Sequence, residues 1–73
     1  MNSDDFNFDA KRIQALRYAM YLDLTNFAIA IGVSRATAWR WEELGVRPSN
    51  LACEALLREE QKLKQQDNEA SRA

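Results

Sequence analysis

Apolar residues recur along this chain at spacings of three and four, the period at which the side chains of an α-helix return to one face. This pattern predicts an all-α protein. The first helix is expected to run from about Ala10 to Tyr21. Its inward stripe consists of Ile13, Leu16 and Met20, with Ala19 beside it.

The residues before this helix contain a helix-start signal. Asp9 is suited to cap the helix, and Phe8 directly before it is expected to pack on Ile13 as a hydrophobic staple. Residues 1–8 as a whole are expected to form a flexible N-terminal arm. Phe6 has two readings, because it can cover the edge of the core or touch a second subunit.

A second helix is expected at 24–31, capped by Asp23. The residues that share its apolar face are Leu24, Phe27, Ala28 and Ile31. Gly32 can end this helix in a left-handed turn without a Cβ clash. Val33 then tucks under the turn and Ser34 caps the next helix, so the sequence predicts two helices joined by a tight turn.

The third helix is expected over residues 34–43. Its inward positions, spaced by three, are Ala38, Trp41 and Leu44, and we expect Trp41 in the core between the first helix and the segment after Pro48. The opposite face offers hydrogen-bond donors and an aromatic ring with little negative charge. Its members are Arg35, Ala36, Trp39 and Arg40.

The last helix is expected from Ser49 to about Gln66, with residues 67–73 fraying. Apolar residues crowd its first half, whereas the second half is polar. We therefore divide the chain into an arm at 1–8, a folded domain at 9–57, and a polar helical extension with a frayed tail at 58–73. A thin apolar seam along this helix predicts a dimer contact made by Leu56, Leu57 and Leu63.

The size of the chain bounds its organisation. With 73 residues it forms one small domain, whose core supplies only a few kcal/mol, so self-association as a homodimer is expected. The apolar share of 47% excludes a wholly disordered protein. No apolar run is long enough to span a membrane, and the acidic N-terminus is unlike a signal peptide, so we expect a cytoplasmic protein.

The residue inventory argues against catalysis. The chain has no histidine and a single cysteine, Cys53, which excludes an internal disulfide and the usual zinc sites. Cys53 is read as a small core residue, with a reactive thiol as the other reading. There is no glycine-rich phosphate loop, and so small a chain leaves little room for a cleft. We expect no enzyme activity, cofactor, metal or small-molecule ligand.

The net charge of −1 hides an uneven distribution. Residues 1–10 carry three acidic groups and no base, whereas residues 11–47 carry six bases against three acids. The segment with the two-helix turn is therefore basic. The excess is modest, so it indicates affinity for nucleic acid only together with the motif.

A short capped helix with outward donors, placed after a glycine-containing turn, is what a helix-turn-helix protein presents to the DNA major groove. The predicted base contacts are Arg35, Ala36, Trp39 and Arg40. The predicted phosphate contacts are Ser34, Thr37 and Arg47. The expected partner is double-stranded DNA.

The motif has further residues at fixed spacing. They are Leu22, Asp23, Leu24, Phe27, Ala28, Ile31, Gly32, Val33, Ser34, Arg35, Thr37, Ala38, Arg40, Trp41, Glu42 and Gly45. With them, the segment from about Ile13 to Pro48 resembles the Cro/C1-type helix-turn-helix family of phage and bacterial repressors. The resemblance implies a small four- to five-helix bundle of the lambda-repressor-like type, here with an extended C-terminal helix.

The resemblance also implies a clamp. In the family, an arginine at the position of Arg17 pairs with the glutamate after the tryptophan, which here is Glu42. The other reading is two unrelated surface charges.

Several positions depart from the family. Leu24 stands where a glutamine reaches a phosphate, and Ile29 and Ala30 stand where charge is usual. Trp39 stands where a small polar residue is usual, after Ala38 in place of the usual valine. Trp39 can lie on a sugar or base-pair edge, or fold over the space beside Ala38.

The leading functional prediction is a sequence-specific DNA-binding regulator, acting as a dimeric repressor on an inverted repeat. The alternative is a protein-interaction module, such as an antitoxin whose main role is to bind another protein. Leu24 and Ile29 are the candidates for that partner contact, although a lone exposed Ile29 is also ordinary for a protein surface.

Overall fold

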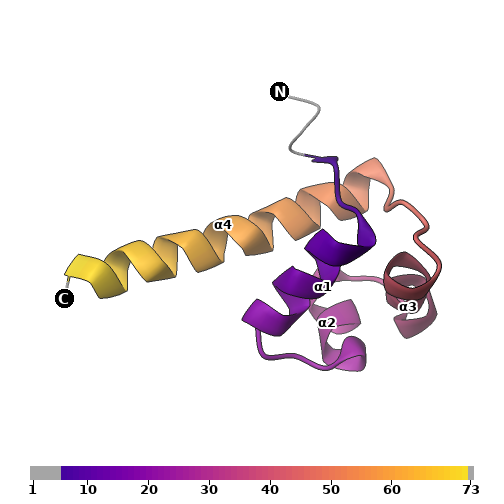
Figure 1. The fold of residues 1–73 in the computed structure, drawn as a ribbon, viewed down its shortest axis with the longest axis horizontal. Coiled ribbons are helices and arrows are strands. Elements are labelled where there is room, and N and C mark those ends of the chain that lie inside the picture. The colour runs from indigo at the N-terminus through magenta and orange to yellow at the C-terminus, as the bar shows by residue number, and fades with distance from the viewer. Residues whose placement is uncertain (1–5, 73) are drawn as a thin grey trace.

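A computed structural model describes residues 6–72 of the chain, with side chains described for residues 6–65. These residues form four helices: α1 (Ala10–Ala19), α2 (Leu24–Ile31), α3 (Arg35–Glu43) and α4 (Asn50–Arg72). No strand occurs among them. The all-α class is confirmed. In Figure 1, α1, α2 and α3 cluster together, and α4 crosses them as a longer helix.

Three of the helices begin at the residues that the sequence indicated. Asp9, Asp23 and Ser34 adopt extended backbone conformations, and each side chain accepts a hydrogen bond from the N–H three residues later. The distances are 2.8 Å for Asp9 and Asp23 and 3.1 Å for Ser34. These bonds satisfy N–H groups that have no partner inside the helix.

The helix α1 ends earlier than expected, at Ala19 rather than Tyr21. Tyr21 has a φ of 59°, the left-handed conformation, which a right-handed helix cannot include. The N–H of Tyr21 bonds to the carbonyl of Tyr18 at 3.0 Å, closing the helix end. Ala19, which was expected beside the apolar stripe, is exposed, whereas Met20 is half-buried against the core.

The turn between α2 and α3 has the predicted form. Gly32 has a φ of 93°, and the N–H groups of Gly32 and Val33 both donate to the carbonyl of Ala28, at 2.8 and 3.0 Å. Val33 packs against the core. This arrangement reverses the chain within a few residues and satisfies the end of α2.

The core lies where the helices meet, since α3 packs on α1 and α2, and α4 packs on the same two helices. Its buried residues are Phe8, Ile13, Leu16, Phe27, Ala28, Ile31, Ala38, Trp41, Ala52, Cys53 and Leu56. Burial raises the pKa of the Cys53 thiol above its ordinary value, so the thiol is protonated at neutral pH. The core reading of Cys53 is confirmed.

The N-terminal segment departs from the expected arm. Residues 1–5 lie outside the described part of the chain. Phe8 is buried in the core, as the staple requires, and Phe6 packs against it. The arm predicted for residues 1–8 is therefore wrong for residues 6–8, because two aromatic rings gain more from burial than from exposure to water.

Leu44 does not face inward. It is 62% exposed and forms the C-cap of α3. A step of three residues falls short of a full helical turn by about 60°, so the last of three such positions has rotated away from the first. Ala38 and Trp41, the first two inward positions, are buried as predicted.

The helix α4 is longer than predicted. It begins at Asn50, next to the expected Ser49, and continues past the expected end at Gln66 to Arg72. The backbone predicted to fray from residue 67 is helical as far as Arg72, and Ala73 lies outside the described residues. The C-terminal part of α4 extends beyond the other helices (Figure 1). Among the described residues, no helix has the length and apolar character needed to cross a membrane.

Candidate functional site

The exposed face of α3 carries all four predicted base-contact residues, Arg35, Ala36, Trp39 and Arg40. Trp39 is 43% exposed, so its indole is neither free in solvent nor part of the core. Ala38 and Trp41 anchor the opposite face, at 0% and 3% exposure. The tight turn and the buried anchors thus fix which side of α3 meets solvent.

This face has unneutralised positive charge. Neither Arg35 nor Arg40 forms an ion pair within the described part of the chain. Glu43 is exposed at the C-terminal end of the same helix, a negative group that the sequence reading did not assign. The two guanidinium groups therefore present free donors, with an acceptor at one end.

The Arg17–Glu42 clamp is confirmed. Arg17 Nε donates to one carboxylate oxygen of Glu42 at 2.8 Å, and Nη2 donates to the other at 3.0 Å. The Glu42 side chain is 4% exposed and that of Arg17 is 16% exposed. The hydrogen bond from Arg17 to Glu42 raises the pKa of the guanidinium above its ordinary value, so Arg17 stays charged at any physiological pH. This pair ties α1 to the end of α3.

Two predicted phosphate contacts, Ser34 and Thr37, are engaged with each other. The Ser34 hydroxyl accepts from the Thr37 N–H, and the two hydroxyl oxygens lie 2.9 Å apart. One hydroxyl donates to the other, which leaves the second hydroxyl proton free for a ligand. Both residues lie at the start of α3, where the helix dipole favours an anion.

Arg47, the third predicted phosphate contact, lies in the loop between α3 and α4. Its side chain is exposed, and Nη1 donates to the side-chain oxygen of Asn7 at 3.0 Å. Nothing in the sequence pattern indicated this contact, since the two residues are far apart along the chain. The structure thereby joins the segment before α1 to the loop after α3.

The predicted dimer residues do not share one surface. Leu56 is 0% exposed, so the prediction that it contacts a second subunit is wrong: it fills the core of its own chain. Leu57 and Leu63 are half-buried. Leu63 borders a largely apolar groove of about 380 Å³ between α1 and α4, whose walls are formed by Arg12, Ala15, Leu16, Ala19, Glu60, Leu63 and Lys64.

The two residues proposed to contact a protein partner also differ in their exposure. Leu24 is half-buried against the core, whereas Ile29 is 70% exposed on α2. A second groove, of about 260 Å³, lies between the end of α2 and α4, and Leu51, which is 78% exposed, forms part of its wall.

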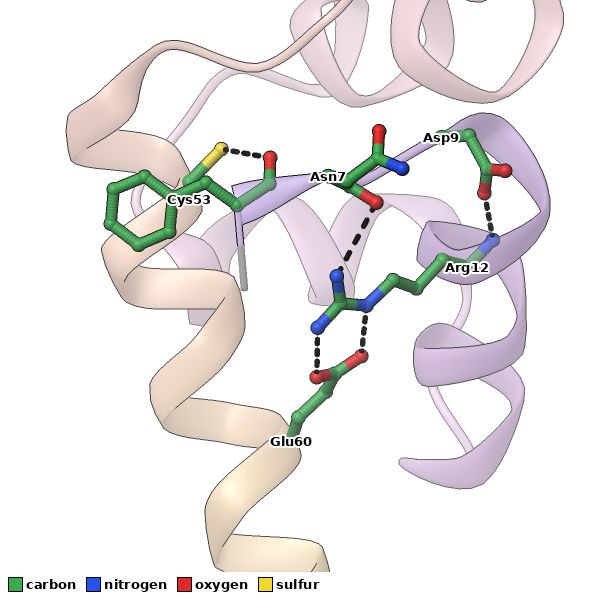
Figure 2. A network of polar contacts seen from close by, with 6 residues as sticks. Asn7, Asp9, Arg12, Cys53 and Glu60 are labelled. Carbon is green, nitrogen blue, oxygen red and sulfur yellow. Dashed lines mark hydrogen bonds and ion pairs between the residues drawn. The ribbon is translucent and has the colours of Figure 1, made fainter. Parts of the chain in front are cut away.

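A second ion pair was not predicted. Arg12 on α1 binds Glu60 on α4 through Nε and Nη2, at 2.8 and 2.7 Å. Figure 2 shows this pair together with Asn7 and Asp9. Helical periodicity places both residues at a surface but cannot tell which surface positions of two helices meet, so no sequence signal identified the pair.

Comparison of the chain with models of protein families, with curated proteins and with solved structures gives no match. The resemblance to the Cro/C1-type family therefore depends on the motif residues named above.

Proposed function

We propose that this protein is a sequence-specific double-stranded DNA-binding regulator that reads the major groove with α3. The observation that carries the proposal is the outward face of this helix, with Arg35 and Arg40 exposed and without ion pairs in the described residues. The Gly32 turn and the buried Trp41 support it, because they hold a short helix in a fixed orientation on the surface.

The chemistry of the face fits base recognition. A guanidinium group matches the O6 and N7 atoms of guanine together, and one such contact discriminates by about 1–3 kcal/mol. Ala36 is suited to a thymine methyl, and the half-exposed Trp39 to a sugar or base-pair edge. Ser34, Thr37 and Arg47 supply phosphate contacts, which position the protein without reading sequence.

The regulator acts as a homodimer on an inverted repeat, in the manner of Cro/C1-type repressors. Two-fold symmetry would set the two α3 helices about 34 Å apart, or one turn of DNA, so that half-site centres are about 10 base pairs or a multiple apart. Binding over a promoter in the cytoplasm would exclude polymerase. No ligand is required, because protein concentration sets occupancy.

The first experiment is selection of bound duplexes from a random library, followed by affinity measurements on the selected operator. Arg40→Ala is expected to relax preference at one base pair by about 1–3 kcal/mol. Arg47→Ala is expected to weaken all sequences alike, because it removes a phosphate contact. Lys62→Ala on α4 is the control for loss of a charge away from this face.

Two outcomes contradict the proposal. One is the recovery of no duplex even at low salt, where contacts between basic side chains and phosphates are strongest. The other is unchanged affinity and preference in both arginine variants, which would show that α3 is not the reading helix.

The alternative, a protein-interaction module, is favoured by a different observation. Ile29 and Leu51 are large apolar side chains that are 70% and 78% exposed. A single exposed apolar residue is ordinary on a protein surface, whereas a contiguous exposed apolar patch marks a contact site. Failure to bind DNA, together with weakened capture of one reproducible partner protein by Ile29→Glu, would support this function instead.

A further inference from the structure

Four residues are joined by a continuous series of hydrogen bonds from α4 to the loop after α3. Glu60 binds Arg12 through two hydrogen bonds of 2.7 and 2.8 Å. The remaining terminal nitrogen of Arg12 donates to the backbone carbonyl of Asn7 at 3.3 Å (Figure 2). The side-chain oxygen of Asn7 in turn accepts from Arg47 at 3.0 Å. This series of hydrogen bonds thus ends at Arg47, a residue proposed to contact phosphate.

The Arg12 end of this series of hydrogen bonds is fixed. The Arg12 and Glu60 side chains are only 29% and 19% exposed, and their bidentate geometry restricts both. The Arg12 guanidinium also lies over the ring of the buried Phe8, 3.8 Å from its centre. The Asp9 carboxylate accepts the Arg12 backbone N–H at 2.8 Å. Asn7 is therefore held against the body of the protein.

The Arg47 end is open. Arg47 is exposed, and within the described residues its side chain uses a single hydrogen bond, to Asn7. A guanidinium group has five N–H donors, so most of them stay available to an anion. The acceptor is a neutral amide, which orients the cation without cancelling its charge as a carboxylate would.

We propose that Asn7 is a positioning residue that holds Arg47 ready for a DNA phosphate, and that Arg12 and Glu60 fix Asn7 for this purpose. The inference rests on the proposed function, since it concerns a residue of that interface. Its physical basis is pre-organisation. A flexible arginine that is already restrained in the free protein loses less conformational freedom when it binds.

The test compares the full chain with Asn7→Ala, Arg47→Ala and the double variant, each titrated against the selected operator over a series of salt concentrations. Asn7→Ala is expected to weaken binding about two- to tenfold. Its salt slope should be unchanged, because the charge of Arg47 remains. For the proposed homodimer, Arg47→Ala should lower the magnitude of the slope by about 2, or about 1 for each copy of Arg47 removed. The double variant should bind no more weakly than Arg47→Ala, because Asn7 acts only through Arg47.

Two further variants sharpen the result. Asn7→Asp keeps an acceptor but neutralises Arg47, so it is expected to weaken binding more than Asn7→Ala and to reduce the slope. Gln61→Ala, which removes an exposed amide on α4, is the matched control and should bind like the unmodified protein. Circular dichroism confirms that each variant is folded.

The outcomes separate the two proposals. If Arg47→Ala weakens binding but Asn7→Ala does not, the positioning role is overturned while the DNA-binding function stands. If the effects of Asn7→Ala and Arg47→Ala add fully, Asn7 acts by another route and the positioning role is again overturned. If the unmodified protein binds no duplex, the proposed function fails, and this inference fails with it.

Discussion

The Arg17–Glu42 pair is asymmetric in its surroundings. The Glu42 carboxylate is almost fully buried, at 4% exposure, and Arg17 is its ion-pair partner. Arg17 is more exposed, donates also to the carbonyl of Leu22 at 3.3 Å, and lies over the Tyr18 ring, with 4.8 Å to the ring centre. Removing Arg17 and removing Glu42 are therefore expected to lower the stability of the fold by different amounts.

This asymmetry predicts unequal effects on stability. Arg17→Ala leaves a buried carboxylate unpaired, which costs about 3 kcal/mol. Glu42→Ala is expected to cost less, because Arg17 keeps its other contacts and reaches water. Urea denaturation of both single variants and the double variant measures the two costs and their coupling. Equal costs would contradict the predicted asymmetry, and additive costs would show that the pair does not act as a clamp.

At the scale of the elements, left-handed residues lie at the ends of three helices, and besides Gly45 after α3 they are a glycine and a tyrosine. Gly32 ends α2 with a φ of 93°, and Tyr21 follows the end of α1 with a φ of 59°. Glycine adopts this conformation freely, whereas tyrosine does so at a cost. Tyr21 is 95% exposed, so its side chain gains little from packing in return.

A matched pair of substitutions tests this difference. Gly32→Ala is expected to destabilise the protein by roughly 1 kcal/mol, through backbone strain alone, because no atom lies within 4 Å of the added Cβ. Tyr21→Gly is expected to stabilise it by about 0.5 kcal/mol, since the strain is relieved and no buried contact is lost. Thermal unfolding of the two variants measures the sign of each change in stability. A stabilising effect of Gly32→Ala would contradict the account of the turn.

At the scale of the whole molecule, folding pairs some of the basic residues with glutamates. Arg12 and Arg17 look like part of the basic surface in the sequence, but each is neutralised by a glutamate from another helix. The positive charge that remains for the proposed interface comes from α3 and the loop after it. The helix α4 meanwhile extends past the other helices (Figure 1). It also borders an apolar groove beside α1.

We propose that this groove holds the expected dimer contact. Leu63→Glu is expected to shift the protein towards monomer, because it places a charge in the apolar wall. Leu51→Glu is the matched control on the same helix, beside the other groove. Sedimentation of both variants over a concentration series measures the effect. Loss of the dimer with Leu51→Glu alone would place the interface at the groove between α2 and α4 instead.

Much of the fold follows from local signals in the sequence. The capping residues Asp9, Asp23 and Ser34 and the left-handed Gly32 act on their immediate neighbours, so they could be read without the structure. The end of α1 was misjudged because the apolar stripe reaches Met20, the residue directly before the left-handed Tyr21. Leu44 was misjudged because a spacing of three drifts around the helix.

The sequence by itself determined the helices, their caps, the tight turn and the outward residues of α3, because these depend on the period of a helix and on contacts a few residues apart. Only the tertiary structure decided that Leu56 fills the core and that Glu60 and Arg47 connect to the N-terminal segment. Contacts between residues about forty or more positions apart depend on how whole helices pack, and helical periodicity does not specify that packing.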